Sequence, residues 1–580
     1  MTTELEARRL TGPHLLDDRQ GAALDVPIAE GDERLLDLWE AEARRLLTAV
    51  GWAGERTHVR RFEGGASLVL TAPIDTLYSA TDVAEAAWVA ATARLNGGRP
   101  DPGAADRLLD VIRQERRPHI RALEAEATRR NVTFLLDDDG VSVGTGVGAL
   151  AFPLDAVPEV ADVDWHRVDD VPLVLVTGSN GKTTSVRLVA AMAAHAGLVA
   201  GLANTDGITV GGVLLEADDY SGPMGARRVL RHPTVQVAVL ETARGGILRR
   251  GLAVRRADAA LVTNISEDHF GDWGVNSLAA LAEAKLVTTR VIPADGAICL
   301  NADDPLLRER GAQLGDRVCW YSLRPDAPEL AQGRAAAWLD GTALMLRRGP
   351  DTSRLMDVSS VPLTLDGRAR YNISNALGAM LAAASLRRDG NTLIPMGAMR
   401  AALEGVHGSI DDNPGRGNLI ELAGVHILID YAHNPAGLEA LVQMASAIPS
   451  ERRLVVLGQA GDRTDDALRA LARAALRLDP SRIVLKEMGQ HRRGREPGEV
   501  RRILAEELER AGAASDMVDS VDTEVEAAES ALGWAREGDL LLLLTHEERG
   551  QVLDLLRGLK ARRWRPGQDV TPASAAPAPS

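Results

Sequence analysis

The sequence contains little cysteine, few aromatic residues and no long apolar run. Its two cysteines, Cys299 and Cys319, support neither a disulfide framework nor a Cys/His zinc site, and we expect both thiols in a core. Aromatic residues make up 3% of the chain, too few for the stacking platforms that bind single-stranded nucleic acid. No stretch approaches the ~20 apolar residues that span a bilayer, and the first residues lack the apolar segment of a secretion signal. We therefore predict a cytoplasmic protein with no membrane partner.

The chain also lacks a positive charge balance. Its 580 residues carry 66 Lys+Arg against 82 Asp+Glu, a formal net charge of −16, which argues against nonspecific binding to nucleic acid. Two arginine pairs, Arg249 with Arg250 and Arg255 with Arg256, either bind a small anion or belong to a solvated surface. The composition, with 45% hydrophobic and 26% charged residues, is typical of a globular protein, and the length allows roughly three to five domains.

The first part of the chain, residues 1–160, predicts an α+β domain without a cluster of catalytic side chains. Segments with helical periodicity and strand-like runs are mixed in this part. We expect helices over 32–50, 81–95 and, as one long charged helix, 104–130, and strands over 66–70 and 132–136. A connector that contains Pro and Asp follows at 152–170.

Two series of buried strands follow the connector. From residue 171, apolar runs lead through glycine into helices, which predicts an α/β central domain at 161–408 with a mostly parallel sheet covered on both faces. A second series from residue 425 predicts a smaller, Rossmann-like α/β domain at 409–562. The end of the chain, 563–580, is rich in Pro, Ala and Ser and predicts a disordered tail.

A phosphate-binding loop (P-loop) is the strongest local signal. The stretch VPLVLVTGSNGKTT at 171–184 runs from an apolar strand into a helix, although Val176 stands where the strict G-x-x-x-x-G-K-[ST] pattern has its first glycine. Backbone N–H groups of such a loop surround phosphate oxygens, the lysine neutralises the β- and γ-phosphates, and Thr183 can ligate Mg²⁺. The predicted nucleotide contacts are Gly178, Ser179, Asn180, Gly181, Lys182, Thr183 and Thr184.

Two later strand ends carry candidate metal ligands. Glu241 follows the run VQVAVL, and His269 ends the segment NISEDH after the run AALVTN. Ligands gather at the carboxyl ends of the strands in a parallel sheet, so both side chains are expected near phosphates bound at Lys182. Either residue alone could be structural. Together with the loop, they predict Mg²⁺ coordination by Thr183, Glu241 and His269.

The order of these motifs resembles the Mur ligase superfamily. The motifs are GSNGKTT at 178–184, Glu241, NISEDH at 264–269, AK at 284–285, YNISNALGA at 371–379, PGRGN at 414–418 and DYAHNP at 430–435. Within the superfamily, the sequence is most similar to the Mur-like, arginine-adding half of cyanophycin synthetase, through ETARGGILRRGL at 241–252, TDG at 205–207, LNADDP at 300–305 and NPGRGNLIELAGVHILIDYAHNPAG at 413–437. The resemblance covers roughly residues 171–550. RRLTGPHL at 8–15 is a shorter similarity to the start of that enzyme.

The resemblance implies roles for further residues. Lys285 would be the carbamylated lysine of the family, an anion that helps to hold a second Mg²⁺; unmodified, it would be a helix-surface lysine. Asn375 would contact the nucleotide, with a helix cap or a turn as the alternative. Arg416 and Asp430 would reach the nucleotide when the C-terminal domain closes.

His433 is the candidate base for the amine substrate, because an imidazole titrates near neutral pH. Packing or helix capping is the alternative role for this histidine. The loops at 461–463 and 491–495 follow later strands, where an amino-acid substrate could bind.

These residues predict an ATP-dependent amide ligase. A carboxylate would attack the γ-phosphate to give an acyl phosphate, and an amine would then displace phosphate. Cyanophycin synthetase has an ATP-grasp domain where this chain has only the connector at 152–170. The resemblance implies that a basic amino acid, arginine or lysine, is joined to an aspartyl side chain of an acceptor. Because the ATP-grasp domain is missing, that acceptor would be made elsewhere. The alternative is a nucleotide-binding regulatory or scaffolding subunit of a separate ATP-grasp enzyme. The expected partners are ATP and amino-acid or peptide substrates, and we expect no nucleic acid. The sequence does not decide whether the protein forms a homo-oligomer.

Overall fold

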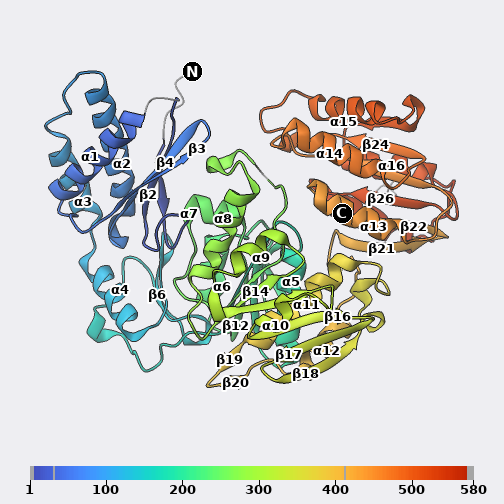
Figure 1. The fold of residues 1–580 in the computed structure, drawn as a ribbon, viewed down its shortest axis with the longest axis horizontal. Coiled ribbons are helices and arrows are strands. Elements are labelled where there is room, and N and C mark those ends of the chain that lie inside the picture. Colours follow the sequence, from blue (N-terminus) through green and yellow to red (C-terminus); the bar gives the residue numbers. More distant parts are fainter. Residues whose placement is uncertain (1–5, 30–32, 269, 411–412, 571–580) are drawn as a thin grey trace, which may run out of the picture.

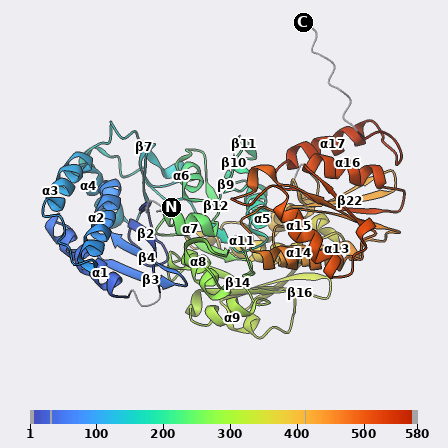
Figure 2. The same ribbon diagram turned by 90° about the horizontal axis from the view of Figure 1, so that it is seen from above.

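The computed structural model describes residues 6–29, 33–268, 270–410 and 413–570. Figure 1 shows three parts along the chain: an N-terminal part in blue, a central part in green and yellow, and a C-terminal part in orange and red. Seen from above in Figure 2, the N- and C-terminal parts lie on opposite sides of the central part. Hydrogen bonds join the central part to both of the others.

The N-terminal part contains an antiparallel sheet with strand order β1-β2-β4-β3. Helices α1 and α2 pack together over it, and Trp39 and Leu68 are fully buried in their common core. This agrees with the predicted α+β architecture. The elements are β1 (Arg8–Leu10), β2 (Gly21–Pro27), α1 (Glu33–Ala49), β3 (Thr57–Phe62), β4 (Gly65–Thr71) and α2 (Leu77–Leu95).

The long helix expected over 104–130 is wrong, because the structure has two helices there. They are α3 (Ala104–Glu115) and α4 (Pro118–Arg130). Pro118 has no N–H to continue a helix and disfavours helical geometry at the residue before it, and Arg117 accordingly has φ −131° and ψ 85°. The chain then forms a small antiparallel sheet of β5 (Phe134–Asp137), β6 (Gly140–Val143) and β7 (Leu150–Phe152).

The sheet of the central part has 11 strands within the described residues. From β9 across to β16 the strands are parallel, and antiparallel strands extend both edges, which confirms the predicted mostly parallel sheet. In spatial order the strands are β11 (Val213–Glu216), β10 (Gly207–Val210), β9 (Ala200–Asn204), β12 (Val237–Glu241), β8 (Leu173–Thr177), β13 (Ala259–Val262), β14 (Ala297–Asn301), β15 (Val318–Ser322), β16 (Ala335–Asp340), β17 (Ala343–Arg348) and β18 (Asp351–Asp357).

Strand β8 shows why this sheet is covered on both faces. Val174 and Val176 point into one core, and Leu173 and Leu175 point into the other. A strand buried on both sides reads as a continuous apolar run, as it does here. One face carries α5 (Lys182–His195), α11 (Arg370–Ser385) and α12 (Met396–Gly405); the other carries α6 (Pro223–Arg231), α7 (Arg244–Arg250), α8 (Leu278–Arg290), α9 (Pro305–Gly311) and α10 (Glu329–Gln332).

The C-terminal sheet has six strands within the described residues, parallel except at one edge. The last strand of the chain, β26, lies between β22 and β23, and its five leucines alternate between the two cores. The spatial order is β21 (Arg416–Leu422), β22 (Val425–Asp430), β26 (Leu540–Leu544), β23 (Arg453–Leu457), β24 (Arg482–Lys486) and β25 (Val518–Val521). The helices are α13 (Pro435–Ser446), α14 (Asp465–Leu476) and α15 (Glu499–Arg510) on one face, and α16 (Glu524–Trp534) and α17 (Arg549–Ala561) on the other.

Three smaller expectations concern cysteines, membrane spans and the tail. Cys299 and Cys319 are buried opposite each other on β14 and β15, which confirms their core position. In the part of the chain that the structure describes, no helix has the length and apolar character to cross a bilayer. Of the predicted tail, 571–580 lie outside the described residues, whereas Trp564 is buried in the C-terminal core.

Candidate active site

The predicted phosphate loop connects β8 to α5 at the carboxyl edge of the central sheet. Two glycines allow the turn. A Cβ atom on Gly178 (φ +142°) would lie 1.9 Å from Thr263 Oγ1, and one on Gly181 (φ +84°) would lie 2.1 Å from Asn375 Oδ1. The backbone of the loop therefore passes directly against neighbouring side chains, and the N-terminus of α5 faces the space where phosphate is expected.

The segment after β13 holds this loop in place. The N–H of Ser179 donates to the carbonyl of Asn264 at 2.9 Å, and the N–H of Asn180 donates to Asn264 Oδ1 at 3.0 Å. Ser179 Oγ also donates to the carbonyl of Ser266 at 2.8 Å. The motif NISEDH thus supports the loop through its first residues. The candidate ligand His269 at its end lies outside the described residues.

Two of the predicted metal ligands meet. Thr183 Oγ1 donates to Glu241 Oε2 at 2.8 Å, and the hydroxyl of Thr205, which the sequence reasoning missed, donates to Glu241 Oε1 at 3.1 Å. The Glu241 side chain comes from the end of β12 and is buried. Within the described ranges no group of three His, Cys, Asp or Glu could hold a metal. A carboxylate and hydroxyl oxygens next to a phosphate loop fit Mg²⁺, which keeps water and phosphate oxygens among its ligands.

Lys285 is buried, so its alternative interpretation as a helix-surface lysine is wrong. It is 1% exposed on α8, and its Nζ donates to the carbonyl of Gly178 at 2.8 Å. Burial, and then the charge of Lys182, lower the pKa of Lys285 to about 7. The Nζ of Lys182 lies over its own loop and donates to the carbonyl of Ser179 at 3.1 Å. Two lysine side chains therefore flank the loop.

Asn375 and Thr184 lie behind the same loop. Asn375 lies inside α11 and neither caps it nor forms a turn, so its alternative role is wrong as well. Its amide nitrogen donates to Asn372 Oδ1 at 3.3 Å, while its oxygen faces Gly181. Thr184, in the first turn of α5, is buried, and its hydroxyl accepts from Asn413 Nδ2 at 3.5 Å.

The C-terminal sheet brings Arg416, Asp430 and His433 to the other side. Arg416 and Asp430 lie opposite each other on β21 and β22, and the Arg416 guanidinium lies 4.3 Å from the centre of the Tyr431 ring. Burial raises the pKa of Asp430 to about 6, although the charge of Arg416 opposes this shift. All three predicted residues thus occupy one edge of the C-terminal domain.

His433 faces the central domain. Its Nε2 lies 3.4 Å from Asp268 Oδ1, and burial lowers the pKa of His433 although Asp268 opposes the shift. The helix cap of α13 is the neighbouring residue Asn434, whose Oδ1 accepts from the N–H of Gly437 at 2.8 Å. The capping alternative therefore belongs to Asn434.

Two sets of bonds between the domains were missed by sequence reasoning. Asn180 and Asn434 exchange side-chain hydrogen bonds, in which the Nδ2 of each donates to the Oδ1 of the other at 3.1 and 3.0 Å. Asp206 accepts from Arg187 at 2.9 Å and from Arg549 of α17 at 2.5 Å. Burial favours the neutral acid, but the surrounding arginines hold the pKa of Asp206 below its ordinary value. Asp206 lies in the motif TDG and Asn434 in DYAHNP, so the only available signal was the motif itself.

The remaining candidates are two loops of the C-terminal domain and the two arginine pairs of the central domain. The loops at 461–463 and 491–495 contact each other, since the N–H of Gly461 donates to the carbonyl of His491 at 2.8 Å. The arginine pairs lie elsewhere. Arg249, Arg255 and Arg256 are exposed, and Arg250 donates to the carbonyl of Arg9 at 3.3 Å. This supports the solvated-surface interpretation over an anion site.

Comparison with known proteins agrees with this geometry. Residues 176–383 match the Mur ligase middle domain, and residues 415–545 match the Mur ligase glutamate ligase domain. This part of the chain belongs to the Mur ligases. Cyanophycin synthetase from Crocosphaera subtropica is 38% identical over 378 residues, which are 64% of this chain and 42% of that protein. Another relative is UDP-N-acetylmuramoyl-L-alanyl-D-glutamate–2,6-diaminopimelate ligase from Parasynechococcus marenigrum, 27% identical over 57% of this chain and 65% of that protein.

Among solved structures, E. coli FolC in complex with ADP aligns with 68% of this chain and 90% of its own, at a TM-score of 0.49 and 18% sequence identity. The chain spans about two fifths of the length of the cyanophycin synthetases it matches. The two Mur ligase domains contain every predicted site residue that the structure describes.

Proposed function

We propose that the chain is an ATP-dependent ligase that joins a carboxylate to an amine through an acyl phosphate. One juxtaposition supports this most directly: Lys182, Glu241 and Lys285 of the middle domain and His433 of the C-terminal domain line one site. The Mur ligase domains support the same reaction class. The site residues named in the sequence are part of this proposal.

The phosphate side stabilises negative charge. Lys182 and the N–H groups at the start of α5 neutralise the γ-phosphate while the substrate carboxylate attacks it. Oxygens of Thr183, Thr205 and Glu241 would hold Mg²⁺, and the ion would supply further neutralisation of the phosphate charge. Asn375, Arg416 and Asp430 bind the nucleotide from the two domains.

The carbamate proposed at Lys285 depends on a neutral amine, because only the free base reacts with CO₂. A pKa of about 7 populates that form at neutral pH. The product would be an anion beside Lys182, and it would orient the γ-phosphate together with a second Mg²⁺. Without the modification, Lys285 would remain bonded to the Gly178 carbonyl.

His433 deprotonates the amine. A lowered pKa keeps its imidazole neutral and able to accept a proton near pH 7, and Asp268 stabilises the imidazolium that forms. The amine then attacks the acyl carbon and phosphate leaves. The bonds from Asn434 and Arg549 hold the two domains together around this step, where water must be excluded.

The finer part of the proposal concerns substrates. Arginine or lysine is the amine, and a side-chain carboxylate of an aspartate-containing acceptor is the acid. The 38% identity to cyanophycin synthetase supports this choice. A separate ATP-grasp enzyme would supply the acceptor.

ADP release measured with every pairing of twenty amino acids and aspartyl peptides tests both levels. The proposal requires release that depends on acid and amine together, with the amide identified by mass spectrometry. Release without an amine would indicate an ATPase. Nucleotide binding without release would indicate a regulatory subunit. If only acidic or neutral amino acids supported release, the ligase would stand and the substrate would be wrong.

A further inference from the structure

We propose that the N-terminal domain is a clamp that positions α8, the helix of Lys285, by holding both ends of the segment 273–290. The inference rests on the proposed function for the importance of Lys285, and it gives the N-terminal domain a role in turnover. Three residues of β3 at alternate positions carry the clamp: His58, Arg60 and Phe62. Alternate residues of a strand share one face.

The first contact holds the turn before α8. The Arg60 guanidinium donates from Nη1 to the carbonyl of Trp273 and from Nη2 to the carbonyl of Gly274, both at 3.1 Å. Both residues of the turn have left-handed backbone, with φ +48° at Trp273 and +67° at Gly274. A tryptophan adopts this conformation only when its surroundings impose it. One rigid guanidinium fork across two successive carbonyls is such a restraint.

Phe62 closes the same contact. A Cβ atom on Gly274 would lie 2.2 Å from the Phe62 ring, so the strand and the turn touch with no space for a side chain. The intervening residue Arg61 points away from the turn, is exposed, and pairs with Glu33 of α1. The two neighbouring arginines of β3 therefore serve different surfaces.

The second contact holds the end of α8. Arg290, its last residue, donates from Nη1 to the carbonyls of His14 at 2.8 Å and Leu15 at 3.2 Å, and pairs with Asp18 at 2.7 Å. These partners belong to the loop at 14–19, which leads from β1 to β2. Two carbonyls and a carboxylate thus surround one guanidinium.

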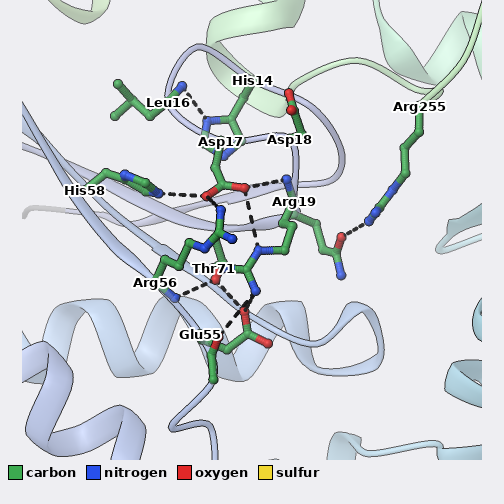
Figure 3. Close-up of polar contacts among 12 residues, drawn as sticks. His14, Leu16, Asp17, Asp18, Arg19, Glu55, Arg56, His58, Thr71 and Arg255 are labelled. Carbon is green, nitrogen blue, oxygen red and sulfur yellow. Dashed lines mark hydrogen bonds and ion pairs between the residues drawn. The ribbon is translucent and has the colours of Figure 1, made fainter. Parts of the chain in front are cut away.

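Asp17 is the centre of the polar contacts within the 14–19 loop, which Figure 3 shows. Its buried carboxylate accepts from the N–H of Arg19 at 2.9 Å and lies 2.8 Å from His58 Nε2. The N–H of His14 donates to the carbonyl of Asp17 at 2.9 Å, and the N–H of Leu16 donates to His14 Nδ1 at 3.2 Å. His58 links this loop to β3, so both contacts depend on one strand.

Lys285 lies between the two contacts. Its Nζ bonds to the phosphate loop at Gly178, and α8 transmits any shift of its ends to that atom because a helix moves as a rigid rod. Small misplacements of a reacting group reduce turnover strongly even when substrate still binds. The clamp therefore acts on kcat, whereas the phosphate loop has its own supports.

Hydrogen exchange of the full-length protein, measured by mass spectrometry, tests the clamp together with steady-state kinetics. In Arg60→Ala and Arg290→Ala we expect amides of 275–290 to exchange at least about tenfold faster. We expect kcat to fall about tenfold and KM for ATP to change less than about threefold. Arg61→Ala, which removes the same charge from the adjacent position, should change neither quantity. Arg60→Lys, which keeps the charge but not the fork, should lie between.

The outcomes separate the clamp from the proposed function. If the wild-type protein makes no amide, the proposed function fails, and the exchange of 275–290 decides the clamp by itself. Unchanged exchange in both Arg60→Ala and Arg290→Ala overturns the clamp. Faster exchange with unchanged kcat in an active enzyme also overturns the clamp, because the contacts of Arg60 and Arg290 would then stabilise the fold without affecting turnover.

Discussion

The phosphate loop and helix α8 lie side by side in one site, yet they are held in different ways. The loop is fixed by its own sheet: Thr183 bonds to a residue 58 positions away and Asn180 to one 84 positions away. Helix α8 packs on the same sheet, but its two ends are also held by another domain, through Arg60 at a separation of 213 positions and His14 at 276. Substitutions in the N-terminal domain that reduce turnover should therefore leave nucleotide binding intact.

The largest effect is expected inside the loop. Lys182→Ala should lower ADP release about 10³-fold, because it removes the charge that neutralises the γ-phosphate. Circular dichroism and the melting temperature should stay close to wild type, because the Lys182 side chain contacts the phosphate loop and does not belong to a hydrophobic core. Lys560→Ala, a change of an exposed lysine on α17, is the control. Near-normal turnover of Lys182→Ala would remove the nucleotide site from the proposal.

Lys285 tests the other side of the comparison. Lys285→Ala should lose about 10²-fold in kcat and regain activity with acetate or another short carboxylate, which replaces the carbamate. The pKa of about 7 gives the pH dependence. The free amine increases as pH rises through 7, so added bicarbonate should stimulate the wild type more at about pH 8 than at about pH 6. Lys182→Ala should not be rescued. If both rescue and bicarbonate dependence are absent, Lys285 is unmodified.

A third prediction concerns the contact between the central and C-terminal domains. Arg549→Ala should lower kcat/KM for ATP about tenfold, which corresponds to about 1.4 kcal/mol, because Asp206 loses one of the two arginines that donate hydrogen bonds to it. Rising salt should weaken the wild type more than the variant, since the pair is only partly buried. Arg557→Ala on the same helix is the matched control. Equal salt dependence in wild type and Arg549→Ala would contradict a role in domain closure.

The smallest effect is a pH dependence of the clamp. Burial lowers the pKa of His14 to about 4, with Asp17, Arg290 and His58 around it. The unfolded chain therefore binds this proton below about pH 6.5 and the folded chain does not, so stability falls as pH decreases from about 6.5 toward about 4. Asp17, whose pKa is lowered, loses its contribution only in more acidic solution.

His14→Asn removes this proton and keeps an acceptor for the N–H of Leu16. Between about pH 6.5 and 5, we expect the wild type to lose about 1–2 kcal/mol more than the variant, read from melting temperatures of the full chain. Parallel pH curves would contradict the prediction. Binding of an ATP analogue should show no such difference.

The sequence allowed the loop to be predicted in full, because each of its parts follows an apolar strand in a known order. Glu241 could be found in the same way. Lys285 could be identified only through the family resemblance. Its burial could not be predicted from the sequence, because the surrounding helix consists mostly of small and apolar residues. Arg60 could not be found at all, because its partners are backbone carbonyls 213 positions away, which have no sequence signature.

Two other misses have different causes. Asn434 lies inside the motif DYAHNP, which the sequence analysis had identified. Its partner Asn180 is in another domain, and the residues of a motif do not indicate which distant residue they contact. Pro118 was visible inside the predicted helix at 104–130. A proline at that position is typical of the first turn of a new helix, as the structure shows.

The central position of β26 has a consequence for synthesis on the ribosome. Strand β22 ends at Asp430 and leads into the loop that carries His433, and it pairs with β26 from His426 to Asp430. Residue 540 is made 110 positions after residue 430, which takes roughly 5 to 20 seconds at ordinary elongation rates. During that interval β22 and β23 lack the strand that separates them. Ribosomes that stop before residue 540 therefore release chains whose middle domain can fold while the loop of His433 has no fixed place.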